Sequence, residues 1–356
     1  MNTVIANPLL GTLLHAVGAT SAAVCYTPQK RVKGWSWQTY WLTQAAFCWL
    51  LLPVLGAYLT IPHLAQVLRA APHDAMVRSF LLGAAYGVGG TAFGLAIRHI
   101  GFSLTYALAV GLSSVLGTLL PPLVRGEFAA LFAKTGSGWV MTGIAVGTVG
   151  IFLCGLSGRL KETDLAGDAT RSDFCVAKGL PLCLLAGVLS AVYGFALEAG
   201  APIARVAEAY GAGVFNGNVT YIFANSGAFL TTLAYCLLLS FKQKSFGEWV
   251  SLPADIGKAS LAKNVGLSVL TGCLWYGQFF FYNLGHVRMG TFKFTSWAIH
   301  MIMLVLISNA LGLALREWRG CKPRTWIAVG ISLTVLVCAV LVLTYGNYLG
   351  DLAAGR

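Results

Sequence analysis

Charged residues divide the chain into long apolar segments. Ten stretches contain no Asp, Glu, Lys or Arg, and the shortest of them has 19 residues. The ten stretches are 1–29, 34–68, 79–97, 99–124, 135–158, 179–197, 209–241, 264–287, 294–315 and 325–350. At about 1.5 Å rise per residue, even the shortest would form a helix about 28 Å long, close to the hydrocarbon thickness of a bilayer. The pattern predicts ten transmembrane helices.

A membrane-spanning β-barrel has a different pattern. Its strands are about ten residues long and alternate between apolar and polar positions. The stretches in this chain are longer and uniformly apolar, and helices are the other structure that satisfies the backbone inside lipid. We therefore expect an all-α integral membrane protein with the lipid bilayer as its surroundings.

The composition excludes two further classes. Hydrophobic residues make up 57% of the chain and charged residues 10%, whereas a soluble domain has about 25% charged residues. Intrinsic disorder requires low hydrophobicity and high charge. The formal net charge of +12 does not indicate a nucleic acid partner, because basic residues collect in the cytoplasmic loops of membrane proteins. The nine cysteines lack the spacing of metal ligands, so we expect no metal site.

The basic residues also predict the orientation. The connections after the first, third, fifth, seventh and ninth helices hold 16 Lys and Arg residues, and the other connections with the C-terminal tail hold 8. The richer side is expected to be cytoplasmic. Both termini would then lie outside the cytoplasm.

The chain divides into two similar halves. The hydrophilic segment 158–178 separates five helices in 1–157 from five in 179–350. At a shift of 189 residues, Gly83 corresponds to Gly272, and similar matches follow along both copies. Two copies with an odd number of helices enter the membrane from opposite sides. They form an inverted repeat, the architecture of secondary transporters that bind substrate near the midplane.

Ionisable side chains inside the apolar stretches are the first candidates for function, because they are costly in a membrane. His15 and His300 lie within predicted helices, and Glu198 and Lys293 lie at the edges of two others. Lys293, Trp297 and His300 share one helical face. Two alternatives remain open: a histidine can bond to a neighbouring helix, and Glu198 and Lys293 can reach the membrane interface.

One face of the predicted helix 264–287 has the chemistry of a sugar site. Trp275, Gln278 and Tyr282 follow at i, i+3 and i+7. An aromatic ring can cover the apolar face of a sugar, while an amide and a phenol bind its hydroxyls. The repeat places Tyr86 at an equivalent position of the first half. The alternative is an aromatic packing or lipid-facing stripe, although a lipid-facing amide at Gln278 would be unsatisfied.

No motif for covalent or nucleotide chemistry is present. The sequence lacks the GxxxxGK[ST] phosphate-binding loop and the GxSxG and HExxH patterns of hydrolases. We therefore expect a transporter that is not an enzyme and needs no cofactor besides a coupling ion, a proton or sodium.

Several segments resemble the L-rhamnose–proton symporter family of the drug/metabolite transporter superfamily. They are His15-Ala-Val-Gly-Ala-Thr-Ser-Ala-Ala23, Tyr26-Thr-Pro-Gln-Lys30, Val32-Lys-Gly-Trp-Ser-Trp37, Gly94-Leu-Ala-Ile-Arg98, Trp275-Tyr-Gly-Gln-Phe-Phe-Phe-Tyr282, Gly285-His-Val-Arg288, Ser296-Trp-Ala-Ile-His-Met301 and Glu317-Trp318. They run in family order over nearly the whole chain. The resemblance implies a ten-helix protein of the bacterial inner membrane that imports a deoxy sugar with a proton.

Some positions depart from the family pattern. The family has Glu at the position of Gln38, a polar Asn-x-Asn-Tyr stretch at 90–93, an amide at Glu198 and an acidic residue at Lys293. Because the usual acidic residue is replaced, we hypothesise that Glu198 and Lys293 form an ion pair in at least one conformation.

The sequence leaves three functional classes open. The first is an importer of a deoxy sugar such as L-rhamnose, driven by a proton or another cation. The second is an exporter of drugs or metabolites on the same scaffold, and the third is a membrane enzyme or sensor without transport. The protein is expected to be a monomer or a homodimer.

Overall fold

The computed structural model describes residues 5–25, 27–100, 102–165, 176–251 and 259–355. Within these ranges all regular structure is helical. The main helices are α1 (Pro8–Val24), α2 (Trp37–Ala45), α3 (Leu52–Thr60), α4 (Leu64–Ala70), α5 (His73–Ile100), α6 (Phe102–Val124), α7 (Phe128–Phe132), α8 (Ser137–Leu165), α9 (Val176–Ala199), α10 (Ala201–Ala209), α11 (Thr220–Gln243), α12 (Ala259–His286), α13 (Ser296–Ala314) and α14 (Pro323–Ala353). The short helical segments are η1 (Pro28–Arg31), η2 (Ala46–Leu51), η3 (Gly213–Val219), η4 (Phe246–Trp249) and η5 (Gly290–Thr295). The predicted all-α class is confirmed.

Eight helical segments in the described ranges are long and apolar enough to cross a membrane. They are Trp37–Thr60, His73–Ala96, Leu104–Val124, Ser137–Leu165, Ala177–Ala209, Gly213–Gln243, Gly290–Ala314 and Pro323–Ala353. Each coincides with one of the ten apolar stretches of the sequence. The other two stretches contain α1, which has 17 residues, and α12, which has 28. Ten spans therefore remain a prediction, of which eight are candidate spans by length and composition.

Helix ends differ from the expected boundaries where charges were used to place them. The helix α8 continues to Leu165, seven residues beyond the apolar stretch that ends at Gly158. Of the predicted connecting segment 158–178, residues 166–175 lie outside the described ranges. Charges mark where a chain leaves the lipid, whereas a helix can continue into water. For this reason charge boundaries underestimate helix length.

The chain forms two compact units. The first unit contains residues 24–88 and 195–283, and the second contains residues 5–23, 89–194 and 284–355. The limits fall inside α1, α5, α9 and α12. Each unit combines segments of both predicted halves. The division into the repeats 1–157 and 179–350 remains a prediction.

Small residues bring α5 and α11 together in the first unit. A methyl group at Gly83 would collide with the carbonyl of Ala224, and one at Gly227 with the carbonyl of Phe80. Gly83 and Gly87 are one helical turn apart and face the same stretch of α11. Such small-xxx-small faces let the backbones of membrane helices approach closely.

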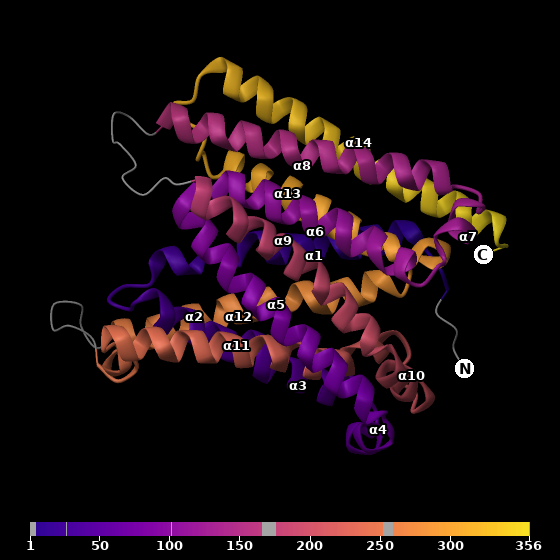
Figure 1. Cartoon of the computed structure of the whole chain (residues 1–356), viewed down its shortest axis with the longest axis horizontal. Coiled ribbons are helices and arrows are strands. Elements are labelled where there is room, and N and C mark those ends of the chain that lie inside the picture. Colours follow the sequence, from indigo (N-terminus) through magenta and orange to yellow (C-terminus); the bar gives the residue numbers. More distant parts are fainter. Residues whose placement is uncertain (1–4, 26, 101, 166–175, 252–258, 356) are drawn as a thin grey trace. The chain divides into compact units, whose positions relative to one another are not determined.

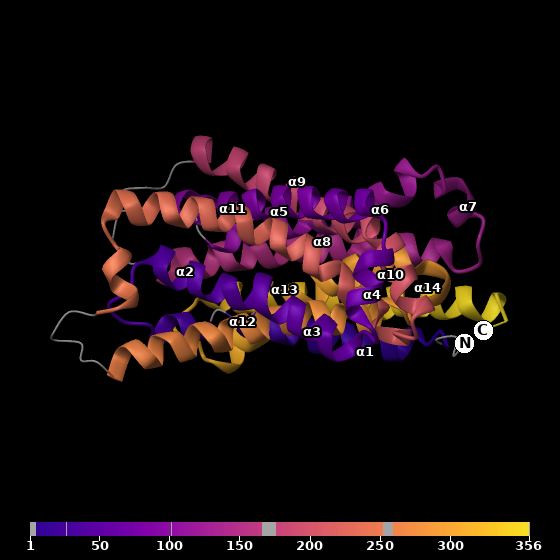
Figure 2. The ribbon, with the colours of Figure 1, turned by 90° about the horizontal axis from the view of Figure 1, so that it is seen from below.

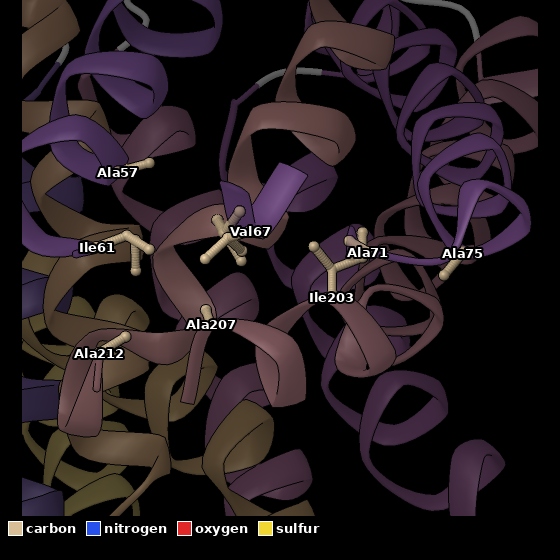
Figure 3. Close-up of a cluster of buried hydrophobic side chains, with 9 residues drawn as sticks. Ala57, Ile61, Val67, Ala71, Ala75, Ile203, Ala207 and Ala212 are labelled. Atoms are coloured by element: carbon tan, nitrogen blue, oxygen red, sulfur yellow. The ribbon is translucent and has the colours of Figure 1, made fainter. Parts of the chain in front are cut away.

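An apolar cluster of the first unit lies where α4 packs against α10. Figure 3 shows Ile61, Val67, Ile203 and Ala207 among its side chains. The short helix α4 lies next to α10 in both views of the ribbon (Figures 1 and 2). Val67 and Ile203 are fully buried. Packing between these two short helices therefore fixes the ends of the longer helices that they follow.

In the second unit, α8 and α14 run side by side (Figure 1). Gly143 of α8 meets Leu343 of α14, and Gly150 meets Leu336. The two leucines are fully buried. The glycines leave the space that these leucines fill. The helix α6 packs against α8, and α13 packs against both α8 and α14.

Candidate functional site

The membrane helix that begins with α2 contains a π-helical segment, η2. The Leu52 backbone N–H donates to the carbonyl of Phe47, five residues earlier. Pro53 follows directly. Proline has no N–H to donate, and its ring collides with the carbonyl four residues earlier, here that of Trp49. The wide turn before Pro53 is therefore a local consequence of the sequence.

The π turn places two tryptophans on one side of the helix. Trp41 and Trp49 are eight residues apart, which is about 80° from eclipsed in a regular α-helix at 3.6 residues per turn. A π turn contains an additional residue and removes most of this offset. Both rings meet Trp275 of α12 with centroids 5.7 Å away, at interplanar angles of 85° and 80°. Trp275 is thus held edge-to-face between them.

Tyr86 joins the same group. Its ring centroid lies 6.3 Å from that of Trp49, at an angle of 70°. Two residues that the sequence predicts for substrate binding, Tyr86 and Trp275, are therefore linked through Trp49. The sequence did not single out Trp41 and Trp49. We name Trp41, Trp49, Tyr86 and Trp275 the aromatic group of the first unit.

Gln278 and Tyr282 follow Trp275 on α12 in the first unit. Both are buried, with relative exposures of 9% and 8%. The burial of Gln278 removes the alternative in which its amide faces lipid. Their roles in binding sugar remain predictions.

Other buried polar atoms near the π segment have no hydrogen-bond partner within the described residues. They are the amide oxygen and nitrogen of Gln44, the indole nitrogen of Trp49 and the hydroxyl of Tyr276. Gln44 is completely buried. Leaving such a group unpaired costs about 1–3 kcal/mol. A ligand that carries hydroxyls, or water in its absence, would supply the missing bonds.

Gln38 takes part in an amide network of the first unit. Its Nε2 donates to the Gln243 Oε1 at 2.9 Å and to the Ser245 Oγ at 3.0 Å. Gln38 is 2% exposed. An amide can donate to these oxygens while a carboxylate cannot. The Gln38 amide thus fits its neighbours and belongs to the packing of α2 against the end of α11.

In the second unit the two predicted histidines meet. The imidazole centroids of His15, on α1, and His300, on α13, are 5.9 Å apart at 68°. His15 is fully buried and His300 is 2% exposed. Two candidate coupling residues from opposite ends of the chain thus form one pair.

Trp297 belongs to the second unit and has protein partners. Its indole N–H faces the carbonyl and the hydroxyl of Ser113, at 3.1 and 3.2 Å. Its ring lies 6.2 Å from that of Tyr193 and touches Gly117. These contacts give Trp297 a packing role beside its predicted role in substrate binding.

Glu198 and Lys293 belong to different units, Glu198 to the first and Lys293 to the second. Both side chains are exposed. The hypothesis that they pair remains a prediction.

A pocket of about 120 Å³ opens in the second unit. At its mouth the Lys161 Nζ lies 3.2 Å from the Glu317 Oε2 and 5.0 Å from the centre of the Trp318 ring. Ser308 and Asn309 add polar groups to its wall. Glu317-Trp318 is one of the segments that carry the family resemblance, and the pocket gives this motif a structural place.

The sequence missed one buried acid, Asp351. It is 3% exposed and lies in the last turn of α14. It comes directly after the last apolar stretch, 325–350. This position next to a predicted membrane helix was the only sign in the sequence that Asp351 could be buried. Among the described residues no three His, Cys, Asp or Glu side chains converge as metal ligands.

The eight candidate spans of the described ranges define a multi-pass membrane protein. The family model for "L-rhamnose-proton symport protein (RhaT)" matches residues 1–349. The chain belongs to this family, which consists of symporters and not enzymes.

Curated relatives agree with the family. A protein of Mannheimia succiniciproducens is 33% identical over 345 residues, covering 95% of this chain and 98% of its own. One of Cronobacter sakazakii is 34% identical over 341 residues, covering 95% and 97%. One of Pectobacterium atrosepticum is 33% identical over 346 residues, covering 95% and 97%. All three are called L-rhamnose-proton symporter.

Proposed function

We propose that this protein imports L-rhamnose, or a closely related deoxy sugar, together with a proton across the bacterial inner membrane. Family membership and the names of the curated relatives support the substrate class. The structural observation that carries the proposal is the aromatic group around Trp275, with the unpartnered amide of Gln44 on the same α2–η2 segment as Trp41 and Trp49. Aromatic rings beside unpaired hydrogen-bonding groups match a molecule with both apolar faces and hydroxyls.

Uptake by reconstituted vesicles tests this function. Labelled L-rhamnose should accumulate when the outside is acidified, and unlabelled L-fucose and L-rhamnose should compete to different extents. A sodium gradient at constant pH is the control for the coupling ion. Accumulation driven by sodium alone would contradict proton coupling, and absence of rhamnose uptake under both gradients would contradict the substrate.

The ten-helix inverted repeat is also a proposal. At the shift of 189 residues α5 corresponds to α12, and the helices that follow correspond in order. In the second unit α6 packs against α8, and α13 packs against α14. At the shift of 189 residues α6 corresponds to α13 and α8 to α14, so the first contact corresponds to the second. In the first unit, Gly83 of α5 abuts α11, while its counterpart Gly272 of α12 abuts the carbonyl of Gln44 in α2. A contact pattern that maps onto itself is expected of two copies of one fold.

Both termini are proposed to lie outside the cytoplasm, because of the distribution of basic residues. Reporter fusions after Lys33, within 158–178 and at the C-terminus test this topology. The first two should report a cytoplasmic position and the third an external one. A cytoplasmic C-terminus would contradict either the ten spans or the orientation.

A further inference from the structure

Asp351 is a buried carboxylate in the last turn of α14. Its Oδ1 accepts the backbone N–H of Thr291 at 2.7 Å. Its Oδ2 is buried and has no hydrogen-bond partner in the described part of the chain. No ion pair joins Asp351 to a cation of these residues. The Oδ1 is thus hydrogen-bonded to the protein, whereas the Oδ2 accepts no hydrogen bond from the described residues.

The position is unfavourable for a structural carboxylate. The C-terminal end of a helix carries a partial negative charge, which disfavours an acid there. A buried charge without a partner adds a desolvation cost. An asparagine at position 351 would accept the Thr291 N–H equally well, without either cost. The hydrogen bond to Thr291 therefore does not explain why an ionisable group is present.

The backbone in front of Asp351 is shaped around both carboxylate oxygens. Gly290 has a φ of 57°, and a Cβ at this residue would collide with both oxygens. The Thr291 hydroxyl donates to the carbonyl of Gly350 at 3.3 Å. These contacts attach η5 to the end of α14, and η5 leads directly into α13. A change in the charge of Asp351 would act on the segment that carries α13.

A row of polar side chains begins at Asp351 and follows α14. Asn347, one turn earlier, donates to the Thr295 hydroxyl at 3.1 Å. The next residue on this face, Thr344, lies with its hydroxyl oxygen 3.0 Å from that of Thr12 on α1. Asn347 and Thr295 are completely buried. Polar groups are scarce and costly in a membrane helix, so several of them on one face of α14 indicate a pathway.

The row ends at the histidine pair. Thr12 precedes His15 by three residues, so both lie on one face of α1. The His15 ring is 5.9 Å from that of His300. All members of the row belong to the second unit. From Asp351 to Thr344 the row covers about 10 Å along α14 at about 1.5 Å per residue.

We propose that Asp351 is the group that takes up the coupling proton, and that the row through Asn347, Thr344 and Thr12 connects it with the His15–His300 pair. This inference rests on the proton coupling in the proposed function. A proton from the external water adds to the Asp351 Oδ2 and gives a neutral carboxyl. When it leaves, this oxygen loses the proton and an imidazole nitrogen of the pair gains it. No electrons are transferred and no covalent bond other than those to the proton changes.

The charged residues adjoining the segments that contact Gly350 and Asp351 are basic. They are Lys293 on η5, Arg288 just before η5 and Lys134 just before α8, whose adjoining residue Thr135 contacts Gly350. On α14 itself the nearest titratable residue before Asp351 is Tyr348, which is exposed. Asp351 is therefore the buried acid of this region among the described residues.

Two transport measurements on reconstituted protein separate coupling from sugar transport. The first is exchange of labelled L-rhamnose at equal concentrations on both sides, and the second is accumulation driven by an imposed pH gradient. Asp351→Asn should retain exchange and lose accumulation. The matched control is Glu127→Gln, an exposed carboxylate that pairs with Arg125 at 3.0 Å. It should behave as the parent protein in both measurements. Thr344→Val, which interrupts the row without changing Asp351, should weaken accumulation and retain exchange.

The outcomes distinguish the two levels of the proposal. If the parent protein exchanges rhamnose but does not respond to a pH gradient, the proposed proton coupling is wrong. If the parent accumulates rhamnose and Asp351→Asn does so equally, Asp351 is not the proton-binding group. If Asp351→Asn also loses exchange, rhamnose-evoked proton uptake by the detergent-solubilised protein decides. Uptake equal to that of the parent would overturn the proposal, and its loss at an unchanged Tm would support it. If Asp351→Asn does not fold, Thr344→Val provides the test. Normal pH-driven accumulation of rhamnose by this variant would overturn the proposed connection between Asp351 and the histidine pair, and weakened accumulation would support it.

Discussion

His15 and His300 lie with their imidazole rings 5.9 Å apart in the second unit, both buried. Two positive charges at this separation would repel each other, so the pair can hold one proton far more readily than two. Two titratable groups that interact this closely act as a unit. We therefore predict that the pair receives and releases a single proton.

This arrangement predicts non-additive mutations. His15→Asn and His300→Asn should each abolish pH-driven accumulation of rhamnose while exchange continues, because each removes the shared site. The double variant should be no worse than either single variant, since residues of one network show an interaction free energy. Losses that multiply in the double variant would indicate two independent roles.

Gln278 should contribute directly to sugar affinity. Gln278→Ala leaves a buried sugar hydroxyl without its partner, at a cost of about 1–3 kcal/mol. Rhamnose binding should weaken by roughly 5- to 150-fold. The exposed Gln66 of α4 supplies the control Gln66→Ala, which should bind as the parent protein. Unchanged affinity in Gln278→Ala at normal expression would place the sugar elsewhere.

Gln44 allows stability and binding to be separated. Within the described residues its amide has no partner, so Gln44→Leu removes an unsatisfied group and fills the same volume. The Tm in the absence of sugar should stay constant or rise, because an apolar residue avoids the cost of about 1–3 kcal/mol. Rhamnose affinity should fall. A lower Tm together with unchanged affinity would show that the amide serves packing and not the ligand.

Pro53 should control the position of Trp49. Pro53→Ala restores a backbone N–H and permits a regular α-helix, which would turn Trp49 by about 80° relative to Trp41. Rhamnose affinity should fall, and the tryptophan emission should shift because Trp49 leaves Trp275. Pro62→Ala, in the exposed turn after α3, is the control and should change neither. Retention of both properties in Pro53→Ala would mean that packing alone maintains the π turn.

The proposed ion pair of Glu198 and Lys293 is tested by a double-mutant cycle. If the two pair in one conformation, Lys293→Ala should impair transport severely, because it leaves a carboxylate without its partner. The double variant Glu198→Gln, Lys293→Asn should recover part of the activity. Strictly additive effects on transport would reject the pairing. If pH dependence persists in the double variant, the coupling proton binds elsewhere, as the inference on Asp351 expects.

The sequence determined the helical class and the placement of most helices. Apolar stretches of at least 19 residues cannot be accommodated in a membrane except as helices, because the backbone must be satisfied within the segment. Charge alone therefore located eight segments that the structure retains as candidate spans. It could not locate helix ends such as that of α8 at Leu165, since a helix does not stop where lipid does.

The sequence also indicated half of the aromatic group. Trp275 and Tyr86 stood out because they share helical faces with polar residues, a relation within one helix that periodicity reveals. Trp41 and Trp49 did not stand out, because their common face exists only after the π turn before Pro53. A period of 3.6 residues assigns them to different faces.

Tertiary structure alone decided which distant residues meet. His15 and His300 were each visible as ionisable groups in apolar stretches, but nothing in the spacing along one helix reports the neighbour on another. Asp351 carried little signal, since one acid beyond an apolar stretch normally lies in water. Its burial follows from the docking of η5, with Gly290 and Thr291, onto the end of α14. The hydrophobic pattern determines whether each helix lies in lipid or in water. Contacts between helices depend instead on how side chains fit together across the packed interface, and this fit cannot be deduced from the pattern along a single sequence.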